Sequence, residues 1–341
     1  MKKRKISNIK KFIFVLIIGL VALVATSFLA LFFNGNHVYS ITDVFNSIFN
    51  YNGDIDSQYF IRNSNMPRIV ADIIVGASLA IAGAIMQGTT KNPMADSGIM
   101  GISSGSTLGV IIVVAFMPWA GRYEKMGMAA LGAAVVTVLI YLIAFVGKGK
   151  ITADRMVLSG MAVSTLLTSV TTAIIIKEGL MTQMVRYTNG SSANTIWNDI
   201  YIALPIFLGG LLISFMISRN LTVMNLGEDV SKGLGSNVVL TKTLATIIVL
   251  VLSAVAVVII GPVAYIGLMI PYICRYLVGT DYRLVLPSCG ILGATFVLIV
   301  DLIAKTIHPG FEFPIGLIIT IIGVPFFVYV SRRQEGDSFY G

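Results

Sequence analysis

The stretch that decides the fold runs from residue 66 to residue 88 and reads MPRIVADIIVGASLAIAGAIMQG. From Ile69 onward it is apolar and about as long as one membrane span, which needs about 20 residues. Gly76, Ala80, Ala84 and Gly88 recur every four residues and therefore share one face of a helix. Small residues on one face let a second helix backbone approach closely. The stretch predicts a transmembrane helix packed tightly against a neighbour.

The rest of the chain has the composition of a membrane protein. Only 12% of its 341 residues are charged and 56% are hydrophobic, whereas a soluble domain carries about 25% charged residues. This excludes soluble enzymes, secreted disulfide scaffolds and disordered chains. Apolar runs fall at about 12–33, 69–88, 98–118, 127–146, 156–176, 200–218, 240–259, 263–278, 286–304 and 315–331. The sequence predicts an all-α integral membrane protein of about ten spans, with residues 1–341 forming a single transmembrane domain.

The distribution of basic residues predicts the orientation. The chain begins with Met-Lys-Lys-Arg-Lys, and the apolar run that follows, 12–33, is longer than the apolar region of a signal peptide, about 7–15 residues. An even number of spans puts both ends on one side, and most of the 24 Lys and Arg residues lie in loops on that side. By the positive-inside rule both termini are cytoplasmic. The net charge of +8 therefore reflects orientation and not nucleic-acid binding.

Polar side chains within the spans mark a candidate translocation path. Gln87, near the inner end of its span, must bond a neighbouring helix or face a wet cavity, because an unsatisfied buried amide costs free energy. The fifth span carries seven hydroxyl side chains between Ser159 and Thr172. Among them Ser164, Thr168 and Thr172 repeat every four residues and form one stripe. We interpret this stripe as the wall of a polar path, the alternative being that hydroxyls bond their own helix carbonyls.

Two carboxylates lie within spans, and intramembrane carboxylates are functional candidates by default. Proton coupling is the functional interpretation of Asp72 and Asp301. Each also has a basic residue four positions away, Arg68 and Lys305 respectively, at the spacing of a local helical ion pair. The local ion pairs are the favoured interpretation.

The sequence contains none of the motifs expected of a catalytic, metal or cofactor site. It has no G-x-x-x-x-G-K-[ST] for ATP, and no HExxH or GxSxG. Cys274 and Cys289 lack CxxC spacing, and His37 and His308 have no partners at ligand spacing. We therefore expect a protein that is not an enzyme and holds no cofactor.

From Met66 onward, the order of motifs resembles the FecCD family of ABC-importer permeases. The resemblance runs to Phe327, with Tyr272 where the family usually has His and Tyr187 where Trp is common. The stretches that carry it are Met66–Gln87, Lys91-Asn-Pro-Met-Ala-Asp-Ser-Gly-Ile-Met-Gly101, Leu158-Ser-Gly-Met-Ala-Val-Ser164, Asn225-Leu-Gly-Glu-Asp-Val-Ser-Lys-Gly-Leu-Gly235, Gly261-Pro-Val-Ala-Tyr-Ile-Gly-Leu-Met-Ile-Pro-Tyr-Ile-Cys-Arg275, Glu312-Phe-Pro-Ile-Gly316 and Gly323-Val-Pro-Phe-Phe327.

The resemblance implies a BtuC-like permease fold in the bacterial plasma membrane. It implies two permease subunits, either two copies of this chain or this chain and a related one, enclosing one path. A pair of separate ATPase subunits supplies energy, and an extracellular lipoprotein or periplasmic binding protein supplies substrate. It also makes the inner loop at about 219–239 the ATPase coupling region, expected as a compact helix pair between hinges. The coupling residues it indicates are Gly227, Glu228, Asp229, Leu234 and Gly235.

The resemblance also implies that basic residues at the outer mouth receive acidic side chains of the binding protein. These are Arg68 and Lys305, with Arg62 in place of the Arg that family members often carry at Asn65. A ferric siderophore is the expected substrate, and haem or cobalamin is the alternative within the family. From a different class, a proton-coupled secondary transporter that uses Asp72 or Asp301 is the rival hypothesis.

Overall fold

The computed structural model describes residues 2–34, 37–96, 101–146, 153–181, 190–307 and 313–338, and these are overwhelmingly helical. The elements are α1 (Lys2–Phe32), β1 (Phe33–Asn34), β2 (His37–Val38), α2 (Ile41–Phe49), α3 (Asp56–Phe60), the π-helical turn η1 (Ile61–Asn65), α4 (Met66–Thr90), α5 (Ile102–Phe116), α6 (Arg122–Val146), α7 (Ala153–Lys177), α9 (Trp197–Met224), α10 (Glu228–Gly233), α11 (Val238–Ile260), α12 (Ile266–Val278), α13 (Tyr282–Thr306) and α14 (Ile315–Ser338).

The prediction of an all-α membrane protein is confirmed. Among the described residues, 8 helices are long and apolar enough to cross a membrane, and each overlaps a predicted span. The predicted spans at 98–118 and 263–278 correspond to the shorter helices α5 and α12, of 15 and 13 residues. At 1.5 Å per residue, α12 extends only about 20 Å, less than the hydrocarbon thickness of about 30 Å. The count of ten spans therefore stays a prediction for these two segments.

Helix α4 is the centre of the bundle. In its most apolar window 89% of the residues are buried, against 11% for α1. The small residues at 76, 80, 84 and 88 explain this position, as the sequence predicts: Gly76 lies directly against the backbone of Gly293 in α13, and Gly88 lies against the Tyr282 ring. A side chain at Gly76 would collide with the Gly293 carbonyl. The stripe lets α4 and α13 pack at backbone contact.

Other glycines make similar close crossings. On another face of α4, Gly83 meets the backbone of Gly267 in α12. Helices α5 and α6 approach each other through Gly105, Gly109 and Gly132. The glycine contacts at Gly76 and Gly83 therefore hold α13 and α12 in fixed positions along α4.

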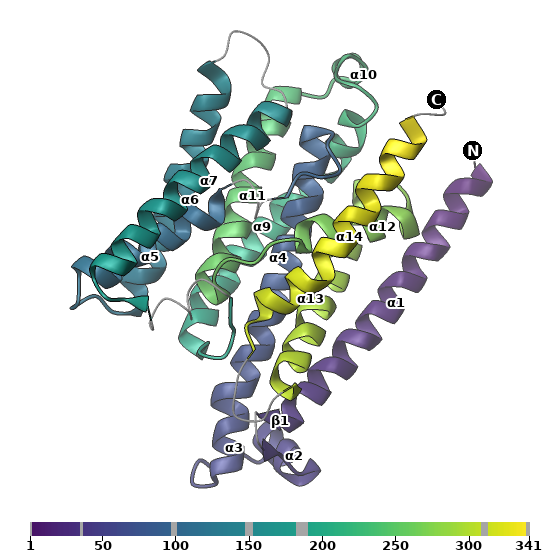
Figure 1. Ribbon diagram of the computed structural model, residues 1–341. Helices are drawn as coiled ribbons and strands as arrows, with labels where there is room; N and C mark the ends of the chain where they lie inside the picture. The colour runs from purple at the N-terminus through teal and green to yellow at the C-terminus, as the bar shows by residue number, and fades with distance from the viewer. Residues whose placement is uncertain are drawn as a thin grey trace.

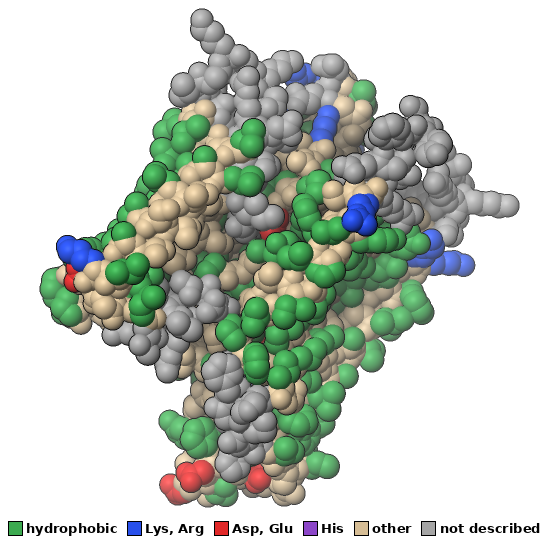
Figure 2. Space-filling view, viewed as in Figure 1, with side chains coloured by type: hydrophobic (Ala, Val, Ile, Leu, Met, Phe, Trp, Pro, Cys, Tyr) green, Lys and Arg blue, Asp and Glu red, His purple; other side chains and the backbone are tan. Residues whose placement is uncertain are grey.

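The bundle has two distinct ends. The start of α1 and the end of α14 lie at the same end as α10, whereas α2 and α3 lie at the opposite end (Figure 1). Apolar side chains cover the flank between these ends, and acidic side chains gather at the tip formed by the α2–α3 region (Figure 2). This arrangement agrees with termini on the same side of a membrane. The positive-inside rule predicts that the end with both termini is cytoplasmic, so the end with α2 and α3 is termed the outer end.

Candidate functional site

A break in the helical structure lies inside the bundle between α11 and α12. Residues 261–265 are not helical, and Tyr265 has a left-handed φ of 71°. Its backbone N–H donates to Asp96 Oδ2 at 3.1 Å, and nearby the Ser191 N–H donates to the Ile260 carbonyl at 2.8 Å. Non-helical backbone at membrane depth persists only where it is buried in protein or lines a water-filled cavity. The break is therefore a candidate part of the transport machinery.

In this region two motifs that are far apart in the sequence, Lys91–Gly101 and Gly261–Arg275, come into contact. Asp96 and Tyr265 are 169 residues apart, and Gln87 Nε2 donates to the Gly267 carbonyl at 2.9 Å. Of the two alternatives for Gln87, the structure shows the bond to a neighbouring helix, although its buried Oε1 has no hydrogen-bond partner among the described residues. Sequence analysis missed the role of Asp96; its only signal was its place in the Lys91–Gly101 motif.

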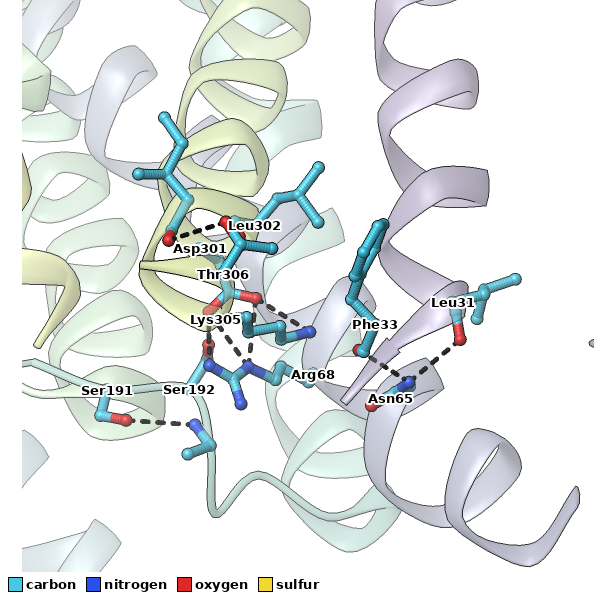
Figure 3. A network of polar contacts seen from close by, with 12 residues as sticks. Leu31, Phe33, Asn65, Arg68, Ser191, Ser192, Asp301, Leu302, Lys305 and Thr306 are labelled. Carbon is cyan, nitrogen blue, oxygen red and sulfur yellow. Dashed lines mark hydrogen bonds and ion pairs between the residues drawn. The ribbon is translucent and has the colours of Figure 1, made fainter. Parts of the chain in front are cut away.

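A buried cluster of charges joins α4 and α13 toward the outer end (Figure 3). Arg68 Nε lies 3.0 and 3.1 Å from the two Asp301 oxygens, and its terminal nitrogen lies 2.7 Å from Oδ1. Lys305 Nζ lies 3.1 Å from Asp301 Oδ2. Ser192 Oγ, from the loop before α9, donates to the same carboxylate at 3.3 Å. The charged side chains are at most 4% exposed, so Asp301 is the shared anion of two buried cations.

The local ion-pair prediction is right for one carboxylate and wrong for the other. Lys305 and Asp301 form the expected i,i+4 pair. Arg68 pairs with Asp301, 233 residues away, and not with Asp72, both of whose buried oxygens lack a hydrogen-bond partner among the described residues. The reason is tertiary: the backbone contact at Gly76 and Gly293 brings α13 within reach of the Arg68 guanidinium, which binds a carboxylate with two parallel donors.

The three basic residues predicted to dock a binding protein lie in different settings. Arg68 and Lys305 are buried in the Asp301 cluster. Arg62, on η1, is exposed, with its guanidinium 4.5 Å from the Tyr51 ring centroid, and its carbonyl accepts from Trp197 Nε1 at 2.8 Å. Asn65 instead ties η1 to α1, donating to the Leu31 and Phe33 carbonyls. Only Arg62 presents its charge at the surface of this chain, and docking stays a prediction for all three.

The hydroxyl stripe on α7 is largely open at the surface. Thr168 and Thr172 are exposed, and Thr172 Oγ1 donates to the Thr168 carbonyl at 2.8 Å. Ser164 is half-buried beside Gly101, with an Oγ that has no hydrogen-bond partner in the described part of the chain. Because the Thr172 hydroxyl bonds its own helix, it needs no water, and this bond alone does not distinguish a path from packing. The path assignment stays a prediction.

The predicted coupling region folds differently from the expected helix pair. Between α9 and α11 it forms one six-residue helix, α10, with Gly227 at φ 123° before it and Gly235 at φ 77° after it. Leu226, Val230 and Leu234 are each at least half exposed. The side chains of Glu228 and Asp229 lie outside those the structure describes, as do those of His37, His308 and Tyr187. Because α9 continues to Met224 and α11 begins at Val238, only residues 225–237 lie between them, which leaves room for one short helix and its two turns.

Hydrogen bonds join the end of α9, which precedes α10, to the start of α13. Thr222 Oγ1, near the end of α9, donates to Asp281 Oδ1 at 3.2 Å, and the Tyr282 N–H donates back to Thr222 Oγ1 at 2.9 Å. Partial burial acts to raise the pKa of the Asp281 carboxyl, but hydrogen bonds and charge from Arg283 outweigh it and leave that pKa below its ordinary value. Asp281 is thus held ionised where α9 meets α13.

The described residues contain no group of three or more His, Cys, Asp or Glu side chains that could hold a metal ion. Cys274 and Cys289 are free thiols buried in the core. What the geometry presents is a helical bundle with an internal helix break, buried charges and an exposed short helix at one end.

Comparison with known proteins gives this arrangement its family. The model of the FecCD transport family matches residues 19–333. The chain belongs to the FecCD transport family. It is 36% identical over 323 residues to the iron(3+)-hydroxamate import system permease protein FhuB of Bacillus subtilis, covering 95% of this chain and 84% of that protein.

Two further similarities agree with this membership. The chain is 34% identical to the cobalamin import system permease protein BtuC of Halobacterium salinarum, over 82% of this chain and 75% of that protein. It superposes on a metal-chelate type ABC transporter, described in an inward-facing conformation, with a TM-score of 0.79 and 26% identity, covering 94% of this chain and 99% of that one. The protein is therefore a multi-pass protein of the bacterial plasma membrane and a permease subunit of an ABC importer.

Proposed function

We propose that this FecCD-family permease carries a ferric siderophore across the plasma membrane by alternating access. The observation that carries the proposal is the similarity to the iron(3+)-hydroxamate permease along nearly the whole chain, at 36% identity. Haem and cobalamin are the alternatives, because the cobalamin permease is nearly as similar, at 34%. The path lies where α7 of one permease subunit faces a second subunit, with Thr168 and Thr172 turned toward it.

Energy comes from two separate ATPase subunits that receive α10. The exposed apolar row Leu226, Val230 and Leu234 supports this, because a short helix with an uncovered apolar face suits a groove in a partner. Gly227 and Gly235 have the positive φ values that only glycine adopts at low cost, and they set the angle at which α10 projects. An external binding protein delivers the substrate at the opposite end, where Arg62 is exposed.

The test is uptake by cells that lack the chromosomal gene and carry it on a plasmid. Cells are given radioactive iron as ferric hydroxamate, and parallel cultures receive haem or labelled cobalamin. We expect plasmid-dependent uptake of the hydroxamate alone. Uptake of haem or cobalamin instead would reassign the substrate within the family.

The same cells distinguish an ATP-driven importer from a proton-coupled carrier. The geometry favours structural roles over a proton pathway for at least one carboxylate, since Asp301 is held by Arg68 and Lys305. Uptake should stop when the partner ATPase is inactivated by substitution in its nucleotide site. It should continue when an ionophore collapses the proton gradient while ATP is maintained. The reverse pattern would overturn the ABC-importer mechanism.

A further inference from the structure

Helix α2 has an apolar face that the rest of the chain leaves uncovered. Its exposed side chains include Ile41 at 74%, Phe45 at 59% and Phe49 at 72% of their full accessibility. These positions recur every four residues and so share one face of the helix. Val44 and Ser47, on a different face, are buried. The helix is therefore divided lengthwise between a face that packs on the bundle and a face that meets its surroundings.

The connection from α1 fixes the level of α2. The two-residue strands β1 and β2 pair antiparallel, with Phe33 opposite Val38. The Tyr39 N–H then donates to the Phe32 carbonyl at 2.9 Å. By Tyr39 the backbone has thus returned to the last turn of α1, and α2 begins two residues later. Ser40 caps it, accepting from the Asp43 N–H at 3.1 Å. Helix α2 starts where the apolar segment of α1 ends.

The neighbouring surfaces indicate what meets the uncovered face. Helix α1 is long and apolar enough to span a membrane, and only 11% of its most apolar window is buried within this chain. Its uncovered apolar flank is a surface that lipid acyl chains can cover. Phe28 and Leu29 are exposed on its final turns, and Val38 of the hairpin, 71% exposed, continues the apolar row toward Ile41. The inward face of α2 instead joins a small core of Ala30, Leu31, Val44, Ile61, Ile69 and Leu298.

Water is on a third side. Asp54 and Asp56, between α2 and α3, are exposed, and the acidic side chains of this region gather at the tip of the molecule (Figure 2). In the same segment, the exposed Arg62 lies over the Tyr51 ring. The segment 39–62 therefore has one face toward protein, one continuous with the apolar flank of α1, and an acidic tip toward water. This is the placement of a helix that lies in a membrane interface, with its apolar face at the acyl boundary.

We propose that α2 is an interfacial membrane helix that inserts Ile41, Phe45 and Phe49 into the leaflet opposite both termini. Lipid, and not a second protein chain, covers the exposed apolar face of α2. Anchored in this way, α2 holds the outer end of α4 at a fixed height relative to the membrane surface. The exposed Arg62 is thereby kept above the headgroups. The proposal does not depend on which substrate the transporter carries.

The experiment places fluorescent probes on the full-length protein in vesicles of phosphatidylethanolamine and phosphatidylglycerol. Cys274 and Cys289 are first replaced by Ala. Single cysteines at Phe45 and Phe49 are then labelled with an environment-sensitive dye, and Asn46 and Asp56 serve as matched controls on the same segment. Each labelled protein is titrated with a phospholipid that carries a nitroxide near its headgroup, and separately with iodide.

The expected result is a blue-shifted emission at positions 45 and 49 that nitroxide lipid quenches and iodide does not. Positions 46 and 56 should show water-like emission and the opposite quenching pattern. Iodide quenching at 45 and 49 as strong as at 56 would place the face in water and overturn the proposal. Blue-shifted emission at 45 and 49 without lipid quenching would mean that another protein chain covers the face, which would overturn it equally.

Discussion

Four charged side chains share the interior where α4 meets α13 near the outer end, and at the residue scale their pairing is what the structure fixes there. Two carboxylates, Asp72 and Asp301, accompany two cations, Arg68 and Lys305, all at most 3% exposed. Buried charges are tolerated when they are paired and hydrogen-bonded. Among the described residues, Asp301 is the carboxylate that forms an ion pair with both cations. Replacing Asp301 removes an ion pair from each cation, whereas replacing Asp72 breaks no hydrogen bond to the described residues.

The first prediction follows from this difference. Asp301→Asn should lower the stability of the protein by about 3–5 kcal/mol, the usual loss when one partner of a buried pair is removed. It should appear as a lower melting temperature of the purified protein in detergent. Asp72→Asn, the matched control within the same cluster, should lower it much less. Equal losses for the two variants would contradict the assignment of Asp301 as the shared anion.

The second residue-scale prediction concerns docking. Arg62→Glu should slow association with the binding protein several-fold at low ionic strength, with the effect shrinking as salt is added, because exposed charges act through steering and are screened. Lys177→Glu, a change at another exposed basic residue, is the control and should have little effect. Surface-binding kinetics with purified binding protein measures both. A salt-independent change in Arg62→Glu would exclude electrostatic docking there.

At the element scale, glycines set how closely the helices cross. Gly83 and Gly76 each face the backbone of another helix, and a backbone cannot move aside as a flexible side chain can. Gly209 in α9 faces nothing within 4 Å. All three glycines lie within helices and share the same weak helix propensity. Comparing substitutions at a crowded glycine and at Gly209 therefore isolates the contribution of close packing.

We therefore predict that Gly83→Ala destabilises the protein by about 1–3 kcal/mol, the range for overpacking a filled interior. Gly209→Ala should be neutral or slightly stabilising, because Ala is the better helix former. Thermal unfolding in detergent measures both variants. If Gly83→Ala were as stable as Gly209→Ala, the contact between α4 and α12 would be looser than the structure shows.

The short helix α10 supports a prediction that tests the coupling proposal. Leu234→Glu should abolish the stimulation of ATP hydrolysis by loaded binding protein in the assembled complex, because Leu234 is 66% exposed and available to a partner. Gly235→Val should do the same by a different route: nothing lies within 4 Å of Gly235, but its φ of 77° strains a β-branched residue.

The control for α10 is Met181→Glu, at a similarly exposed apolar residue that follows α7 in the chain. It should leave stimulation intact, and all three variants should still insert in the membrane. Normal stimulation in both α10 variants would show that the ATPase engages another part of the permease.

At the scale of the whole molecule, the two exposed faces of α7 have different chemistry and therefore different surroundings. Leu166 and Thr168 are both exposed, so on this helix exposure does not distinguish the face toward a second subunit from the face toward lipid. The chemistry of the stripe does suggest which face is which. Hydroxyls at Ser164, Thr168 and Thr172 suit a wet path, and Leu166 suits lipid or a dry interface.

Cysteines at Thr168 and Thr172 should therefore react with water-soluble thiol reagents in the assembled transporter, and nucleotide should alter their reactivity. A cysteine at Leu166 should react more slowly in the same complex. Labelling rates in a Cys274→Ala, Cys289→Ala background measure this. Uniformly slow labelling at all three positions would mean that the stripe is a packing surface.

The sequence by itself determined the membrane class, the apolar segments that become helices, the packing stripe on α4 and the Lys305–Asp301 pair. Each depends on hydrophobic length or on spacings of three and four residues, which the helical period converts directly into geometry. Only the tertiary structure decided that Arg68 turns to Asp301, that Asp96 supports the break at Tyr265, that α10 is one helix and that α2 exposes an apolar face. These features depend on which helices cross and at which position along their axes. Backbone contacts between residues far apart in the chain determine those crossing positions, and the spacing of residues within one helix does not predict them.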